Sequence, residues 1–224
     1  MSTIVDLTYS MKPHWRWHFE PELKTHHDKG DNFLVHFFTT SCHSYTHVDA
    51  PLHFVPGGKT LAEIPLTQWV GEAAVVHLAP VEAEQAIDAP DLERAGGHVR
   101  PDDIVLLRSD WPRRCDVMSP DFWGRGPYIT REACEWLVER QVRTVGYDFP
   151  TDYILRYAIT DPEREITKEE CTTHDIFLPR GICMVEYLTN LHLLEGRERV
   201  PVYILPLNVE GVEGCPARAV AVLD

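Results

Sequence analysis

The stretch "SCHSYTHVDAPLHF" at residues 41–54 decides how the rest of the chain is interpreted. It gathers three histidines and one aspartate between positions 43 and 53, namely His43, His47, Asp49 and His53. Imidazole nitrogen and carboxylate oxygen are the donor atoms that zinc, manganese and related divalent ions accept in proteins. The sequence therefore predicts a metal site built largely from this one segment.

The geometry of this segment follows from the spacing of its histidines. A strand rises about 3.3 Å per residue, so His43 and His47 on one straight strand lie roughly 13 Å apart, too far for a single ion. A helix would bring them one turn apart, but Pro51 and the β-branched neighbours of His47 disfavour a helix. We therefore expect a bent, irregular segment that follows the strand predicted at 32–38.

Apolar, β-branched and aromatic runs predict most of the remaining elements. Capping signals and helical periodicity predict helices at 88–95 and 130–141, and a short helix or turn at 189–196. Strands are predicted at 4–7, 32–38, 72–78, 103–109, 143–149, 181–188, 200–209 and 217–224. Alternation of helices with strands is typical of α/β proteins with a mixed sheet.

The chain has 224 residues, a length that favours one large domain. We expect a single sheet-rich α/β domain over 1–224, with a charged excursion near 151–170. The net charge of −14 and the absence of a basic stripe argue against nucleic acid as a partner. No apolar run reaches the length of a membrane span, and the six cysteines are dispersed, so we expect a cytoplasmic protein with no membrane contact.

The segment 43–54, "HSYTHVDAPLHF", resembles the H-x-G-T-H-x-D-x-P-x-H signature of the metal-dependent cyclase-like hydrolases. That family includes bacterial kynurenine formamidases and isatin hydrolases. The matching positions are His43, Thr46, His47, Asp49, Pro51 and His53, whereas Tyr45 stands where the family usually has glycine. The similarity extends to "THDIFLPRGICMVEYLTNL" (173–191), where His174 is followed twelve residues later by Glu186.

The resemblance implies a swivelling β/β/α-type fold that assembles as a homodimer or homotetramer. It also implies one or two divalent ions per chain, zinc or manganese. His43, His47 and Asp49 would hold the first ion, and Asp49, His174 and Glu186 would hold a second where two are present. His53 would be a general base or a further ligand.

The predicted activity is hydrolysis of an aryl formamide or lactam C–N bond in a small-molecule substrate. A divalent ion lowers the pKa of bound water toward about 7, and a histidine titrates in the range needed to move its proton. No G-x-S-x-G nucleophile elbow is present. The alternatives are a lactone hydrolase, a polyketide-type cyclase using the same site, and a non-catalytic metal-dependent binding module.

Three aromatic residues are candidates for substrate binding. Trp15 and Trp17 either form a wall over the pocket or pack at a subunit interface. Tyr45 either touches the substrate or fills the space left by a neighbouring loop. Two acidic residues, Asp148 and Asp152, either orient ligand histidines from behind or have a structural role.

Overall fold

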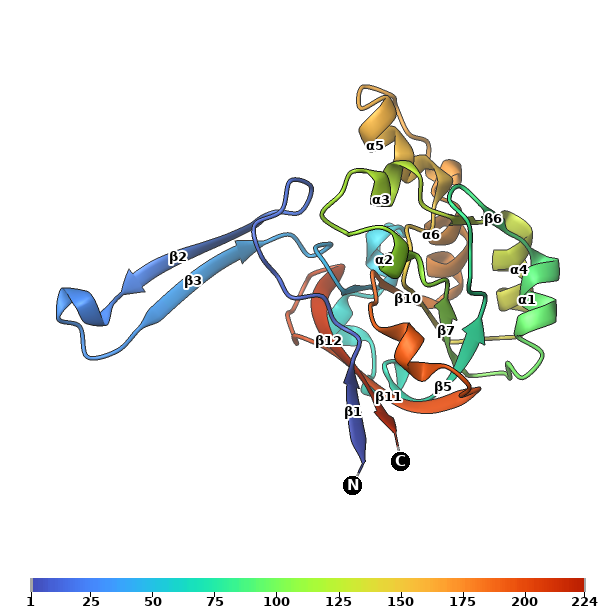
Figure 1. The fold of residues 1–224 in the computed structure, drawn as a ribbon, viewed down its shortest axis with the longest axis horizontal. Helices are drawn as coiled ribbons and strands as arrows, with labels where there is room; N and C mark the ends of the chain where they lie inside the picture. Colours follow the sequence, from blue (N-terminus) through green and yellow to red (C-terminus); the bar gives the residue numbers. More distant parts are fainter. Residues whose placement is uncertain (1, 224) are drawn as a thin grey trace.

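A mixed eight-stranded sheet organises the molecule, which is described over residues 2–223 by a computed structural model (Figure 1). The strand order is β1-β12-β11-β5-β7-β9-β10-β4. Strands β5, β7, β9 and β10 run parallel to one another, and the remaining pairs of the sheet are antiparallel. The bounds are β1 Thr3–Asp6, β4 His47–Asp49, β5 Val70–His77, β7 Ile104–Arg108, β9 Thr144–Tyr147, β10 Cys183–Glu186, β11 Arg199–Pro206 and β12 Gly214–Leu223.

Strand β4 closes this sheet into a barrel-like ring. Its central residue, Val48, lies opposite Val185 of β10 on one side and Cys215 of β12 on the other. Both edges of a three-residue strand are therefore hydrogen-bonded. The prediction of a bent segment is confirmed only for residues 41–46, because two available sheet edges hold His47–Asp49 extended.

Side chains alternate between two cores, as expected for strands buried on both faces. The core enclosed by the ring contains, among others, Val75, Leu106, Val185 and Val202. The opposite face of the parallel strands packs against helices α1 (Ala89–Ala95), α4 (Arg131–Glu139) and α6 (Thr172–Phe177). These three helices lie together on one side of the sheet in Figure 1.

Shorter elements surround this frame. They are α2 Trp111–Arg114, α3 Asp121–Gly124, α5 Tyr157–Thr160, the 3₁₀ turns η2 Pro51–His53, η5 Tyr153–Arg156 and η8 Leu191–Leu194, and the small parallel pair β6 Ala86–Ile87 and β8 Tyr128–Ile129. The charged segment 151–170 is exposed in its later part, but it begins with the buried residues Thr151, Asp152 and Ile154. No helix within residues 2–223 combines the length and apolarity needed to cross a bilayer.

A two-stranded antiparallel ribbon projects from the body of the molecule (Figure 1). It consists of β2 (Phe19–Thr25) and β3 (Val35–Thr40), and we call residues 19–40 the arm. The predicted strand at 32–38 therefore begins later than expected, and β2 was not predicted because Glu20, Pro21 and Glu22 break the apolar pattern. Several large apolar side chains of the arm are exposed: Leu23, Phe33, Leu34, Phe37 and Phe38.

Candidate metal centre

Strands β4 and β10 place three of the predicted ligands. His47 and Asp49 are two residues apart and share a face of β4, while Val48 between them points into the ring core. Glu186 lies directly opposite His47 in the antiparallel register. As a result, His47 Nε2 is 3.4 Å from Asp49 Oδ1 and 3.5 Å from Glu186 Oε2.

His43 reaches the same point from the turn that precedes β4. Its Nδ1 lies 2.8 Å from Asp49 Oδ1, and its Nε2 lies 3.0 Å from Glu213 Oε1. Gly214 makes this approach possible, because a Cβ atom at that position would lie 2.6 Å from the Val48 carbonyl oxygen and 3.3 Å from Asp49 Oδ1. A side chain at position 214 would therefore push β12 away from the centre.

Helix α6 contributes a further predicted ligand, His174, to the same cluster. The Nε2 atom of His174 is 3.7 Å from Glu186 Oε1 and 3.8 Å from Asp49 Oδ2. Its Nδ1 donates to Asp152 Oδ2 at 2.8 Å, an assignment that follows from the ionised carboxylate being an acceptor only. Asp152 therefore orients a predicted ligand, whereas Asp148 accepts hydrogen bonds from the backbone amide and hydroxyl of Ser109 and has a structural role.

The donor atoms of this cluster fit a divalent cation. His47 Nε2 and both carboxylate oxygens of Asp49 are buried, and within residues 2–223 none of them makes a hydrogen bond of good geometry, although Asp49 Oδ1 lies 2.8 Å from His43 Nδ1. Burying a charged or polar group without a partner costs several kcal/mol. A divalent ion bound by imidazole nitrogen and carboxylate oxygen would remove that cost, and this donor set suits zinc or manganese.

Two overlapping groups of donors meet the distance requirement for a shared ion. One contains His43, Asp49 and His53, the other His47, Asp49 and Glu186, and the donor atoms within each lie within 4.8 Å of one another. This division differs from the one implied by the family resemblance, which joins His43 to His47. Asp49 belongs to both groups in either division, and the assignment of ligands to one or two ions stays a prediction.

Electrostatics show how strongly the cluster attracts positive charge. Burial alone would lower the pKa of His43 and of His174, but their carboxylate neighbours raise both to about 9: Asp49 acts on His43, and Asp152 with Glu186 acts on His174. Burial raises the pKa of Glu186 to about 7. In the absence of a metal ion, the protonated rings of His43 and His174 balance the negative charge of the buried carboxylates.

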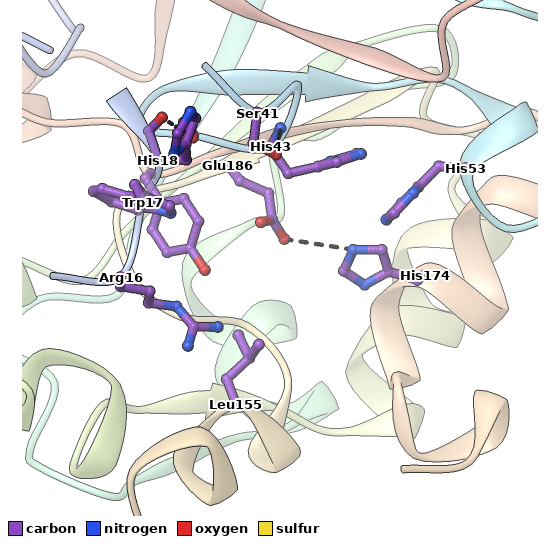
Figure 2. A pocket seen from close by; sticks show the side chains of 11 residues that line it. Arg16, Trp17, His18, Ser41, His43, His53, Leu155, His174 and Glu186 are labelled. Carbon is purple, nitrogen blue, oxygen red and sulfur yellow. Dashed lines mark hydrogen bonds and ion pairs between the residues drawn. The ribbon is translucent and has the colours of Figure 1, made fainter. Parts of the chain in front are cut away.

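The cluster forms one wall of a cavity of about 510 Å³ (Figure 2). The cavity is lined by Arg16, Trp17, His18, Ser41, His43, Ser44, His53, Leu155, His174, Glu186 and Tyr187. His53, at the end of η2, faces this space with its ring centroid 4.0 Å from that of His43 and 5.4 Å from that of His174. Burial lowers the pKa of His53 to about 4, so its ring is neutral near pH 7.

The three aromatic candidates have different positions. Trp17 is buried and lines the cavity, 5.0 Å from the ring of Tyr187. Trp15 is half exposed and does not line it; its Nε1 donates to the Met118 carbonyl. Tyr45 does not reach the cavity either, because its ring packs 4.6 Å from that of Trp17 and its hydroxyl donates to the Lys12 carbonyl.

Tyr45 occupies the signature position that usually holds glycine, and its φ angle explains that preference. The angle is +58°, in the left-handed region where a side chain is disfavoured. Tyr45 is 1% exposed, and packing of its ring against Trp17 offsets the backbone strain. The ring of Tyr45 therefore lies behind Trp17 and does not line the cavity, and a role for Tyr45 in substrate binding stays a prediction.

Several residues of the site were not predicted from the sequence, among them Arg16, Leu155, Tyr187 and Glu213. Tyr187 directly follows the predicted ligand Glu186, and this adjacency could have indicated that Tyr187 lies near the site. Arg16 and Glu213 reach the site from loops, and no spacing in the sequence connects them to the histidines. Long-range folding alone brings these residues together.

The closed mixed sheet and the buried histidine–carboxylate centre define an α/β protein built around a metal site. A family model described as "Putative cyclase" matches residues 5–151. The chain belongs to this cyclase family, as its signature predicted. The matched range contains the first motif but ends before His174 and Glu186.

Named relatives cover most of the chain. A kynurenine formamidase of Erythrobacter litoralis is 31% identical over 195 residues, covering 86% of this chain and 79% of the relative. A kynurenine formamidase of Bacillus thuringiensis is 26% identical over 202 residues, covering 90% of this chain and 86% of the relative. Among solved structures, isatin hydrolase A of Labrenzia aggregata superposes with a TM-score of 0.81 at 24% identity, covering 99% of this chain and 94% of that one. These likenesses confirm the predicted α/β fold with a mixed, sheet-rich core.

Proposed function

We propose that this chain hydrolyses an aryl amide, either a formamide or a lactam, with the help of one or two divalent ions. The relatives confirm the prediction of a metal-dependent hydrolase acting on carbon–nitrogen bonds other than peptide bonds. The observation that carries the proposal is a set of buried metal-ligand atoms without a hydrogen bond of good geometry, His47 Nε2 and the Asp49 carboxylate. They lie directly behind His43 and Glu186, which line the aromatic cavity.

We assign the ion or ions to His43, His47, Asp49, His174 and Glu186, with zinc or manganese as the metal. A bound ion would activate water and polarise the substrate carbonyl. The chain's own residues do the remaining work. Asp152 and Glu213 hold two of the ligand histidines in place, and Trp17 with Tyr187 provides an apolar wall for a flat ring.

His53 is the proposed general acid–base residue. Its ring faces the cavity and stacks on His43, and within residues 2–223 none of the hydrogen bonds involves its side chain. An imidazole with two uncommitted nitrogens is suited to take a proton from the attacking water and deliver one to the leaving nitrogen. The same ring is close enough to Asp49 to serve as a ligand, which is the alternative role.

Metal analysis of the purified protein beside a substrate panel tests the proposal. The panel contains formanilide, isatin and dihydrocoumarin, which represent an aryl formamide, a lactam and a lactone. We expect bound zinc or manganese and turnover of an amide, with His47→Ala losing both. Turnover of the lactone alone would favour the lactone hydrolase, and bound metal without any turnover would favour the binding module.

We also propose that the chain forms a homodimer or homotetramer through the arm. An isolated two-stranded ribbon is marginally stable in water, and this one exposes several large apolar side chains. Sedimentation at micromolar concentration is expected to show an oligomer that Phe37→Asp with Phe38→Asp dissociates. Leu193→Asp, an equally exposed apolar position outside the arm, is the control. A monomeric wild-type protein would reject this proposal.

A cytoplasmic location is the remaining part of the proposal. All six cysteines are free thiols, and a chain with this cysteine usage suits a reducing compartment. Fractionation of the native host, with a periplasmic marker as control, tests it.

A further inference from the structure

Arg16 faces the cavity from the side opposite the metal centre. In Figure 2 its guanidinium points toward the open middle of the cavity, near Leu155, while Glu186 and His174 lie across from it. The residue is only partly exposed. Its guanidinium carbon lies 5.3 Å from the ring centroid of Trp123, within the range of a cation–π contact that orients the side chain.

The guanidinium of Arg16 lacks the partner that this acidic protein gives to most of its arginines. Within residues 2–223, twelve arginines form an ion pair with a carboxylate, and Arg16, Arg100, Arg180 and Arg197 do not. The last three are fully exposed to water, whereas Arg16 is only partly exposed. No hydrogen bond of the described chain uses its side chain either, so all five N–H donors remain available to a ligand.

The surroundings of Arg16 specify the kind of ligand. A guanidinium presents a planar fork that matches a carboxylate with two parallel hydrogen bonds. The wall between Arg16 and the metal centre is formed by Trp17, Tyr187 and Leu155, which suits a flat aromatic ring. A volume of about 510 Å³ accommodates such a ring with a short side chain.

We infer that Arg16 binds a carboxylate of the substrate, so the substrate class is an aryl amide that carries an anionic side chain. This inference rests on the proposed amide hydrolysis and names the substrate class for it. The amide lies at the His53 and Glu186 end of the cavity, and the carboxylate lies at the Arg16 end. A neutral lactam leaves the guanidinium without a partner and is the poorer substrate.

Matched pairs of formamides test this inference. The acids are N-formylanthranilate and 3-(2-formamidophenyl)propanoate, and each is compared with its primary amide, which has the same shape and no charge. The readout is the ratio of kcat/KM for the acid to kcat/KM for its amide. Arg16→Gln is expected to lower this ratio about 10- to 100-fold, mainly through KM, since charge-assisted hydrogen bonds are worth about 1.5–3 kcal/mol.

Two further variants separate recognition from general electrostatics. Arg16→Lys keeps the charge but loses the fork, so an intermediate ratio is expected. Arg100→Gln removes an exposed, unpaired arginine outside the cavity and is expected to leave the ratio unchanged. If Arg16→Gln leaves the ratio within about twofold of wild type, or Arg100→Gln lowers it equally, the inference is overturned.

A binding measurement distinguishes failure of this inference from failure of the proposed function. Calorimetry with 3-phenylpropanoate on metal-free protein reports the anion site without any turnover. Binding that Arg16→Gln weakens at least tenfold, in a protein that cleaves no formamide, would remove the proposed function and keep the carboxylate site. Formamide turnover by a protein in which Arg16→Gln binds 3-phenylpropanoate as tightly as wild type would keep the proposed function and remove the carboxylate site.

Discussion

Replacing Asp152 with asparagine is expected to weaken metal binding without removing any ligand. Asp152 Oδ1 accepts from the backbone amide of Thr173 at 2.8 Å, so the asparagine carbonyl keeps that position. The new NH₂ group then lies where Oδ2 accepted from His174 Nδ1 at 2.8 Å. Two donors would face each other, and the imidazole proton moves from Nδ1 to Nε2, the atom that faces Glu186 and Asp49.

The size of the effect follows from the role of Asp152 behind a ligand. Loss of such an orienting partner typically lowers metal affinity about 10- to 100-fold, or about 1.4–2.7 kcal/mol. Titration of metal-free protein with zinc or manganese, in competition with a chromophoric chelator, measures this difference directly. Thermal unfolding of the metal-free variants shows whether each one is folded.

Asp148→Asn is the matched control, because Asp148 is an equally buried aspartate that contacts no ligand histidine. It is expected to bind metal as wild type does, whatever its stability. Wild-type metal affinity in Asp152→Asn, or an equal loss of affinity in both variants, would show that Asp152 does not orient His174 for metal binding.

The remaining predictions concern four positions. His47→Ala is expected to remove most of the bound metal, as measured by elemental analysis. His53→Ala should keep the metal and lose about 10²–10⁴-fold in kcat; a loss of about one ion per chain would instead make His53 a ligand. Gly214→Ala should lower unfolding free energy by about 1–3 kcal/mol and reduce metal content, because its Cβ would meet the Val48 carbonyl at 2.6 Å, whereas Gly97→Ala, with no atom within 4 Å, should do neither. Burial raises the pKa of Asp148 to about 7, so the folded state holds that proton more tightly than the unfolded state. The free energy of unfolding should therefore decrease as the pH rises from about 4 to about 7. Urea unfolding of Asp148→Asn at several pH values should lack this decrease.

The ligands that share a segment were the most predictable part of the centre. His43, His47, Asp49 and His53 lie within one stretch, so donor chemistry alone suggested a metal site. The backbone of that stretch was less predictable, because β4 is extended only through pairing with β10 and β12, far along the chain. Local propensity contains no information about such partners.

The walls of the cavity were beyond local reasoning. Tyr45 stands at the glycine position of the signature, and the sequence left open whether it touches the substrate or fills space beside a loop; its left-handed backbone turns the ring toward Lys12 and Trp17. Arg16 precedes a strand that the sequence pattern did not reveal, and only the arrangement of loops brings its guanidinium to the cavity. The core strands at 72–78 and 103–109 were predicted well because continuous apolar runs report burial directly.

Closure of the ring by β4 has a consequence for the order of events during folding. Residue 47 pairs with residues 186 and 216, so the ligand set exists only after two very long loops have closed. The unfolded chain therefore offers an ion only the donors of residues 43–53, without His174 and Glu186, and contacts of such high sequence separation form slowly. Removal of the ion by a chelator should accordingly speed unfolding and leave the refolding rate nearly unchanged. The ion would then stabilise the folded barrel without directing its formation.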